Sequence, residues 1–270
     1  MGRRSDNPVL EPPLRFQAWL FGPFRVLRDG AEIADPAWRR ASARTLLKWF
    51  LLNPCHRFSA AELCETLWAG RSRTESLNKL HVTLHHLRRV LEPDLPGRRP
   101  SSFIRTGENG RYWFDPLDCW WTDVGEMERL WRSARARSER GDPDVVIATL
   151  HRLLDYYSQG FLPEELYEDA FARFRDAHER RHDETLQALL KLYGDMGRRY
   201  EVLTCAQRML DRDPYSECAV TALVESYLEQ GNRAAAISEL DRFVRLLNDD
   251  LGVQPSRRLM ALRERMHPSR

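Results

Sequence analysis

Long apolar runs and paired cysteines are both missing from this 270-residue sequence. No uninterrupted apolar stretch approaches the roughly 18 residues of a membrane-spanning helix, so we expect no membrane partner and a cytoplasmic protein. The cysteines are odd in number and lack Cys-x-x-Cys spacing, which is typical of reduced thiols that fill small spaces in a core. They are Cys55, Cys64, Cys119, Cys205 and Cys218.

Signatures of catalysis are also missing. The sequence has no Gly-x-x-x-x-Gly-Lys-Ser/Thr loop for phosphates and no Gly-x-Ser-x-Gly nucleophile turn. His81 and His85 have a spacing that can present two imidazoles to zinc, but no further ligand follows at a customary distance. His178 and His182 repeat that spacing, and we expect them on a solvated helix face. The sequence therefore predicts no catalytic residue, no metal and no cofactor, and an enzyme with an unrecognised site is the weakest alternative.

Charge of the two signs is unevenly distributed along the chain. Residues 1–114 hold 19 Lys and Arg against 11 Asp and Glu, a balance of +8. Residues 115–270 hold 23 against 29, a balance of −6. A basic half suits a polyanion, because each neutralised phosphate releases condensed counterions. Random clustering of surface charge is the alternative interpretation.

Strand and helix signals succeed one another in the basic half. Alternating apolar and polar residues over 16–24 and 25–33, around Gly22-Pro23 and Asp29-Gly30, predict a short antiparallel meander. A helix over 44–52 stops at Asn53-Pro54. A capping box over Ser59–Glu62 opens a second helix that runs to Gly70.

Leucines at 3-4-3-4 spacing mark a third helix over residues 72–91, opened by a second capping box, Ser72–Glu75. Such a helix buries one side and presents donors on the other, and Asn, Lys and Arg side chains can read base edges or hold phosphates. The stripe is Leu77, Leu80, Leu84, Leu87 and Leu91, and the opposite face carries Glu75, Asn78, Lys79, Val82, His85, His86 and Arg89.

A hairpin is predicted over residues 103–114, with its turn at Asn109-Gly110. A helix followed by a hairpin is the order of a winged helix, and this unit is expected to end near Phe114. Trp120-Trp121 follow as a linker anchor that packs two domains together, because two large rings would be costly to leave in water.

The acidic half contains an internal repeat of 34 residues, the tetratricopeptide (TPR) period. A more divergent unit surrounds Gly141, with Leu150 and Leu153 at equivalent positions. Repeats of this kind present an open face to other proteins, although an array that only stiffens or dimerises the chain is the alternative. Leu189, Tyr193, Gly197, Ala206 and Met209 recur as Leu223, Tyr227, Gly231, Leu240 and Phe243.

These segments resemble a known family. Residues 20–26 with Asp29-Gly30, residues 58–63, residues 87–91 and Gly110–Tyr112 look like the OmpR-type winged helix of SARP-family transcriptional regulators. Residues 160–169 and 251–255 resemble the bacterial transcriptional activator domain that follows it. The fold class is then mainly α: an N-terminal winged helix with a short β meander, three helices and a hairpin wing, followed by an all-α TPR-like repeat domain. The expected boundaries are a disordered lead-in over 1–14, a winged helix over 15–115 and an activator domain over 122–266.

The resemblance implies a sequence-specific transcriptional activator. Its partners would be double-stranded DNA with tandem promoter repeats, RNA polymerase holoenzyme and a second copy of the chain on DNA. Its location would be cytoplasmic and nucleoid-associated. An alternative is a TPR-type adaptor whose winged helix serves as a protein-binding surface, and salt-dependent DNA binding separates the two.

The candidate DNA contacts divide into two sets. The base-facing set lies on the third predicted helix, where Val82 could meet a thymine methyl group. The second set would contact phosphates or the minor groove from the wing and the helix flanks. The base-facing set is Asn78, Lys79, Val82, His85, His86 and Arg89, and the second set is Arg73, Arg88, Arg105 and Arg111.

Overall fold

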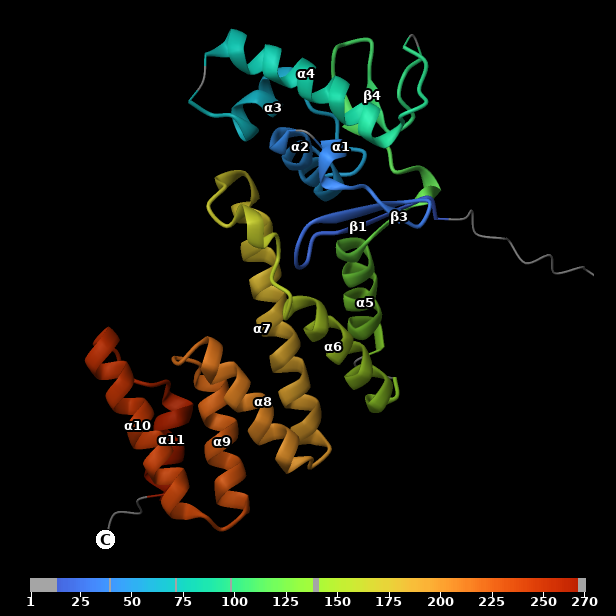
Figure 1. The fold of residues 1–270 in the computed structure, drawn as a ribbon. Helices are drawn as coiled ribbons and strands as arrows, with labels where there is room; N and C mark the ends of the chain where they lie inside the picture. Colours follow the sequence, from blue (N-terminus) through green and yellow to red (C-terminus); the bar gives the residue numbers. More distant parts are fainter. Residues whose placement is uncertain (1–13, 39, 71, 98, 138–140, 267–270) are drawn as a thin grey trace, which may run out of the picture. The chain divides into compact units, whose positions relative to one another are not determined.

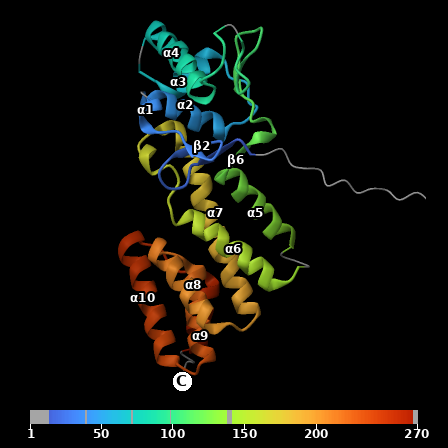
Figure 2. The same ribbon diagram turned by 45° about the vertical axis from the view of Figure 1, so that its right-hand side comes forward.

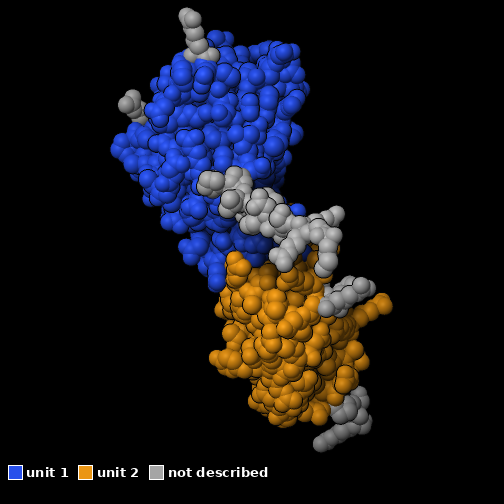
Figure 3. All heavy atoms as spheres, turned by 90° about the vertical axis from the view of Figure 1, so that its right-hand side faces the viewer, with its two compact units in different colours: residues 1–132, 155–176 blue, residues 133–154, 177–270 orange. Residues whose placement is uncertain are grey.

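The computed structural model describes residues 14–38, 40–70, 72–97, 99–137 and 141–266. The expected lead-in over residues 1–14 lies outside this part, except for the exposed Leu14. The chain divides into two compact units: residues 1–132 with 155–176, and residues 133–154 with 177–270 (Figure 3). The mainly α fold class is confirmed, with strands only in the first unit among the described residues. No helix in this part is both long and apolar enough to cross a membrane.

A four-stranded sheet opens the first unit. It consists of β1 (Phe16–Trp19), β2 (Arg25–Arg28), β3 (Ala31–Glu32) and β6 (Trp120–Thr122), in the order β3-β2-β1-β6 (Figure 1). The predicted meander is confirmed, since β1 pairs with β2 and β2 with β3 in antiparallel register. Strand β6 pairs parallel with β1, so the sheet extends past the end near Phe114 that the sequence predicted.

The tryptophans of β6 pack inside the first unit. Trp120 stacks on Phe16 with ring centroids 4.3 Å apart and meets Phe114 edge-on at 5.1 Å. Trp121 lies on the other side of the strand, 5.3 Å from Trp19. The prediction that this pair anchors a linker between two domains is therefore wrong. A parallel partner about a hundred residues away leaves no turn signal in the sequence.

Four helices and a hairpin complete the winged helix (Figure 2). They are α1 (Asp35–Trp38), α2 (Ala41–Leu52), α3 (Ala60–Leu67), α4 (Arg73–Leu91), β4 (Ile104–Thr106) and β5 (Tyr112–Phe114). Both predicted capping boxes are present, at Ser59 and Ser72. The four-residue α1 was not predicted, and α2 begins at Ala41, before the predicted start at Arg44.

A segment from the second half of the sequence completes the first unit. Lys48 of α2 has a side chain only 1% exposed, and its Nζ donates to Glu164 Oε2 at 3.0 Å and Glu165 Oε1 at 2.9 Å. Both carboxylates belong to the short helix η2 (Pro163–Glu165). A buried ammonium is tolerated only when it is paired. These bonds therefore make residues 155–176 part of the packing of the winged helix.

Asp123, at the start of α5 (Asp123–Arg137), ties the same unit together. Its buried carboxylate accepts the backbone N–H groups of Leu20 and Phe21, each at 2.8 Å. Burial raises the pKa of Asp123 to about 6, although these hydrogen bonds oppose the shift. The carboxylate satisfies two backbone donors at the point where the chain leaves β1.

The second unit contains the helical repeat, and α6 (Pro143–Tyr157) and α7 (Ala172–Asp195) each contribute residues to both units. Then follow α8 (Arg199–Arg212), α9 (Glu217–Glu229), α10 (Arg233–Leu251) and α11 (Arg257–Met266). The period of 34 is confirmed: Arg198 N–H donates to Tyr193 O, Asn232 N–H donates to Tyr227 O, and both distances are 2.8 Å. Gly197 and Gly231 occupy the left-handed position of these two turns, with φ of 65° and 73°.

The predicted solvated face around His178 and His182 is wrong. His178 is 5% exposed, and burial lowers the pKa of both imidazoles to about 4. The reason is that this side of α7 is buried along its length, since it also buries Thr185 and Leu189. The sequence did not predict this burial because both histidines lie in a run of polar and charged residues.

We expect Lys48→Met to destabilise the chain by about 2–4 kcal/mol in urea unfolding. The reason is that Glu165, 14% exposed, would keep a charge without its partner. The matched control is the exposed Lys191→Met, which should stay within about 0.5 kcal/mol of wild type. The double variant Lys48→Met/Glu165→Gln should recover part of the loss. An unchanged Lys48→Met midpoint would contradict this role for the ion pair.

Stability should also depend on pH through His178. Its pKa is about 4 when folded against an ordinary 6.5, so its neutral form stabilises the fold fully above pH 6.5. This contribution is lost as the pH falls from 6.5 towards 4. Near pH 5, the wild-type chain should take up about one more proton on unfolding than the His178→Gln variant. The measurement is the slope of the unfolding free energy against pH, compared between the two proteins. Identical slopes would rule out this titration.

Candidate nucleic-acid interface

Helix α4 buries one side in the core of the winged helix. Leu80, Leu84, Leu87 and Leu91 of the predicted stripe are buried, whereas Leu77 is only half-buried. The opposite side remains open, and four of its exposed residues follow one another at 4-3-4 spacing, which places them along one line. That line is Asn78, Val82, His85 and Arg89.

Lys79 and Arg73 lie at the edges of this exposed line. Lys79 is half-buried, and its ammonium stands 4.9 Å from the centre of the Trp68 ring. This cation–π contact directs the charge towards α3 rather than along the line. Arg73 is exposed in the first turn of α4. Both side chains suit contact with the backbone of a nucleic acid better than contact with base edges.

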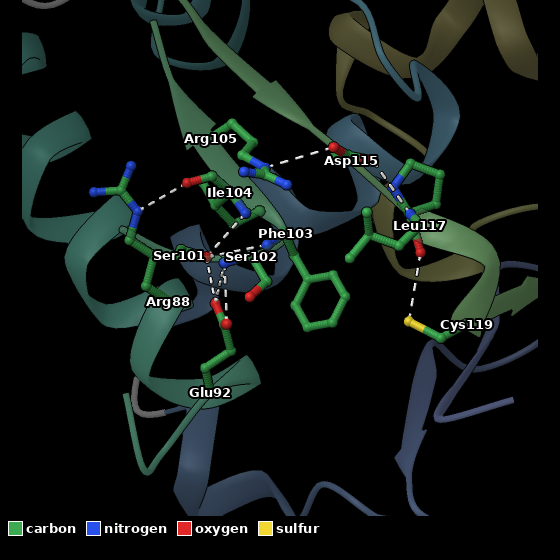
Figure 4. Close-up of polar contacts among 11 residues, drawn as sticks. Arg88, Glu92, Ser101, Ser102, Phe103, Ile104, Arg105, Asp115, Leu117 and Cys119 are labelled. Atoms are coloured by element: carbon green, nitrogen blue, oxygen red, sulfur yellow. Dashed lines mark hydrogen bonds and ion pairs between the residues drawn. The ribbon is translucent and has the colours of Figure 1, made fainter. Parts of the chain in front are cut away.

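His86 and Arg88, which the sequence assigned to DNA, are bonded within the fold. His86 Nε2 lies 2.7 Å from the carbonyl oxygen of Trp38. Arg88 donates through Nε to Ile104 O at 3.1 Å (Figure 4). It also donates through Nη2 to Thr106 Oγ1 at 2.7 Å. Burial also lowers the pKa of Arg88. These two residues hold α4 against α1 and against β4.

A second set of bonds fixes the end of α4 to the chain that enters the wing. The Glu92 carboxylate accepts the backbone N–H of Ser102 at 3.0 Å and the hydroxyl of Ser101 (Figure 4). The Ser101 hydroxyl oxygen in turn accepts the N–H of Ile104 at 3.0 Å. Arg89, one turn earlier, donates to Leu95 O at 2.9 Å, but this bond is exposed and ends in the loop directly after α4 rather than at the wing. The helix and the wing are therefore held in one arrangement.

The predicted hairpin is confirmed, but its turn begins earlier than expected. Gly110 N–H donates to Gly107 O at 3.0 Å, which puts Glu108 and Asn109 at the central positions. Gly110 then has a φ of 71°, a value that favours glycine. The predicted centre at Asn109-Gly110 was thus one residue late, because a bulged hairpin loop uses the same residue types.

The two wing arginines differ in how they are held. Arg105 Nε stands 3.5 Å from Asp115 Oδ2, so a neighbouring carboxylate offsets its charge (Figure 4). Arg111 is exposed and donates through Nη1 to the carbonyl oxygen of Arg57 at 2.9 Å. Glu62 lies 3.8 Å from the same nitrogen.

Arg57 is a candidate that sequence reasoning missed. Its guanidinium covers the ring of Trp113 at 4.7 Å and is exposed. It reaches the wing because Phe58 pairs with Tyr112 across an isolated bridge, with backbone bonds of 2.8 and 2.7 Å. Arg57 and Arg111 therefore stand side by side on the wing. In the sequence, the one sign of this strand-like contact is Phe58, an apolar residue between two polar residues just before the capping box.

The described part of the chain was also compared with the predictions for metal ligands and for cysteines. No group of three or more His, Cys, Asp or Glu side chains there could hold a metal ion. Cys64 and Cys205 are buried as predicted, and burial raises the pKa of Cys205 to about 11. Cys55 and Cys218 are exposed, so the core-filling role predicted for them is wrong.

Comparison with known proteins identifies the family. Residues 122–267 match the bacterial transcriptional activator domain family, and the chain belongs to it. It is a transcriptional regulator of the SARP type.

Two relatives extend this result. The regulatory protein AfsR of Streptomyces coelicolor is 25% identical over 98% of this chain, which spans a quarter of the length of that relative. A structure of Mycobacterium tuberculosis EmbR, in complex with a low affinity phosphopeptide, has a similar fold. It matches with a TM-score of 0.77 and 20% identity over 94% of this chain and 65% of that one.

We expect Arg88 and Arg89 to respond differently to alanine. Arg88→Ala should cost about 1–3 kcal/mol of unfolding free energy, because it removes two bonds between α4 and β4. The exposed Arg89→Ala should stay within about 0.5 kcal/mol of wild type. Urea unfolding of the two variants makes the comparison, and equal losses would mean that Arg88 does not hold the wing.

Proposed function

We propose that this regulator binds double-stranded DNA with the exposed face of α4 in the major groove and the wing against the backbone. The observation that carries the proposal is the line of Asn78, Val82, His85 and Arg89 on a helix whose other side is buried. An α-helix fits the major groove, where each base pair presents a distinct pattern of donors and acceptors.

The side chains of this line match the chemistry of base edges. Asn78 can make a bidentate contact with adenine, and Arg89 can make one with guanine. Val82 offers a methyl surface to thymine, and His85 can donate or accept a hydrogen bond. Lys79, Arg73, Arg57 and Arg111 would neutralise phosphates, with Arg105 in a lesser role because Asp115 faces it.

The proposal gives His86 and Arg88 a positioning role. Their bonds to Trp38, Ile104 and Thr106 leave them less able to meet DNA. They would instead set the angle between α4 and the wing, on which simultaneous contact with groove and backbone depends.

Two further parts of the proposal rest on the family. The protein would occupy tandem promoter repeats as a pair of chains, and it would activate transcription by contact with RNA polymerase holoenzyme. Linked occupancy of neighbouring sites raises the effective concentration of each contact, which suits weak single-site binding. The repeat helices of the second unit offer a surface for such protein contacts.

A protein-binding adaptor is the second candidate, and one observation favours it. The second unit contains a cavity of about 580 Å³ between α7 and α9. Its lining includes Leu190, Val202 and Thr221, together with the paired charges Arg199–Glu229 and Arg258–Glu225. A repeat groove of this kind suits a peptide. Peptide binding in this cavity is compatible with DNA binding by the first unit. The two hypotheses are therefore distinguished only by whether the chain binds DNA.

The test is a titration of the full chain with its promoter DNA and with random DNA. Asn78→Ala or Arg89→Ala should cost about 1–3 kcal/mol on the promoter and much less on random DNA, because only base contacts distinguish sequences. Fluorescence anisotropy at a fixed salt concentration measures both.

Two controls accompany this titration. Arg57→Ala/Arg111→Ala should weaken both DNAs alike and flatten the log-log salt dependence by about one unit for each phosphate that is no longer neutralised. The exposed Arg180→Ala on α7 should change neither affinity. Unchanged promoter affinity in both Asn78→Ala and Arg89→Ala, with the fold intact, would remove α4 from the groove. Absence of any salt-dependent DNA binding would favour the adaptor.

A further inference from the structure

An exposed apolar pair stands on the loop over residues 163–169, which belongs to the first unit. Tyr167 is 97% exposed and its neighbour Leu166 is 54% exposed. Neither residue is used by the fold or by the proposed DNA contacts. Large apolar side chains next to each other in water suggest a surface that a partner covers.

The backbone of this loop is fixed at both ends. Leu162 before it is buried and donates its N–H to Leu20 O at 2.9 Å, and Phe171 after it is fully buried. Arg175 donates from Nη1 to Glu165 O at 2.7 Å and from Nη2 to Glu168 O at 3.2 Å. With Lys48 on the Glu164 and Glu165 side chains, the loop is bonded along its whole length.

A fixed loop presents Leu166 and Tyr167 at low entropic cost. Binding usually requires ordering of the loops and side chains that make contact, and that cost is already met here by the fold. Tyrosine is also among the residues that most often dominate binding energy, since its ring is large and it has few rotatable bonds. The geometry is that of a small, preorganised contact.

The charge of the loop selects the kind of partner. Glu164, Glu168 and Asp169 are exposed around the apolar pair, and Glu164 retains its solvent exposure although it pairs with Lys48. Carboxylates repel the phosphates of DNA and of anionic lipids. A protein surface with an apolar pocket bordered by Lys or Arg is complementary to both features.

The loop lies on the side of α2 opposite α4 within the first unit, as Figures 1 and 2 show. DNA bound along α4 would therefore leave it accessible. We infer that Leu166 and Tyr167 form the contact by which this regulator binds a basic, pocketed surface of RNA polymerase holoenzyme. This inference rests on the proposed function, which supplies the partner, and the structure supplies the contact residues.

The experiment titrates the labelled full chain with purified RNA polymerase holoenzyme in the absence of DNA. Tyr167→Ala should weaken binding about thirtyfold and Leu166→Ala by a smaller factor, as expected for removal of a dominant contact. The matched control is Tyr200→Ala on α8, which removes another exposed tyrosine, 79% exposed, and should leave the affinity unchanged. Urea unfolding should show the same stability for all three variants.

A charge variant tests the chemistry of the partner. Glu168→Lys should weaken binding about fivefold at low salt and reduce the dependence of affinity on salt, because it replaces attraction to a basic surface by repulsion. Glu184→Lys, a reversal at an exposed position of α7, is the control and should have no such effect.

Several other outcomes would contradict the inference. Wild-type affinity in Tyr167→Ala, or no binding of the wild-type chain to polymerase, would overturn the inference. So would a dimer of the full chain that Tyr167→Ala converts to a monomer in sedimentation, because the loop would then contact a second copy. The DNA titration is separate, so specific DNA binding without polymerase binding rejects this inference together with the polymerase part of the proposed function and leaves its DNA part intact. Polymerase binding that is unchanged in Tyr167→Ala rejects this inference alone. Polymerase binding without specific DNA binding rejects the DNA part alone.

Discussion

The pairing of Lys48 with Glu164 and Glu165 is the constraint on which the first unit depends. An ammonium group in the interior is costly unless carboxylates meet it, and here the only carboxylates that bond Lys48 among the described residues come from a segment more than a hundred positions later. Helix α2 also supplies the core beneath α4. The orientation of the candidate DNA-binding helix therefore rests on a helix whose own burial requires the activator-domain segment.

The same dependence appears at the edge of the sheet. Strand β6 and Asp123 close the open side of β1. The region that matches the activator domain family begins at residue 122, where β6 ends, and Asp123 is the next residue. Family boundaries and compact units thus divide the chain differently. The family region begins at residue 122, whereas the first unit runs to residue 132 and resumes at 155. The winged helix and the start of the activator domain share one hydrophobic core.

Much of the fold could be predicted because its signals are local. The capping boxes at Ser59 and Ser72, the hairpin around Gly110 and the period of 34 each depend on residues close together in sequence. The missed features require distant partners. The pairing of β6, the burial of Lys48 and His178, and the position of Arg57 on Trp113 follow only from tertiary packing. The candidate site divides in the same way: periodicity located the exposed line on α4, but it could not show that His86 and Arg88 turn inwards.

The parallel pairing of β1 with β6 has a consequence for synthesis of the chain. During translation, domains fold from the N-terminus as they emerge, at about 5–20 residues per second. Strand β1 is made first, but its partner follows about a hundred residues later, and the carboxylates for Lys48 come later still. Loop closure over such separations is slow compared with local helix formation. A ribosome that has just completed the wing therefore carries helices α2, α3 and α4 without the contacts that finish their core. The nascent chain acquires the geometry of the candidate DNA-binding site only after part of the region that matches the activator domain family has been translated.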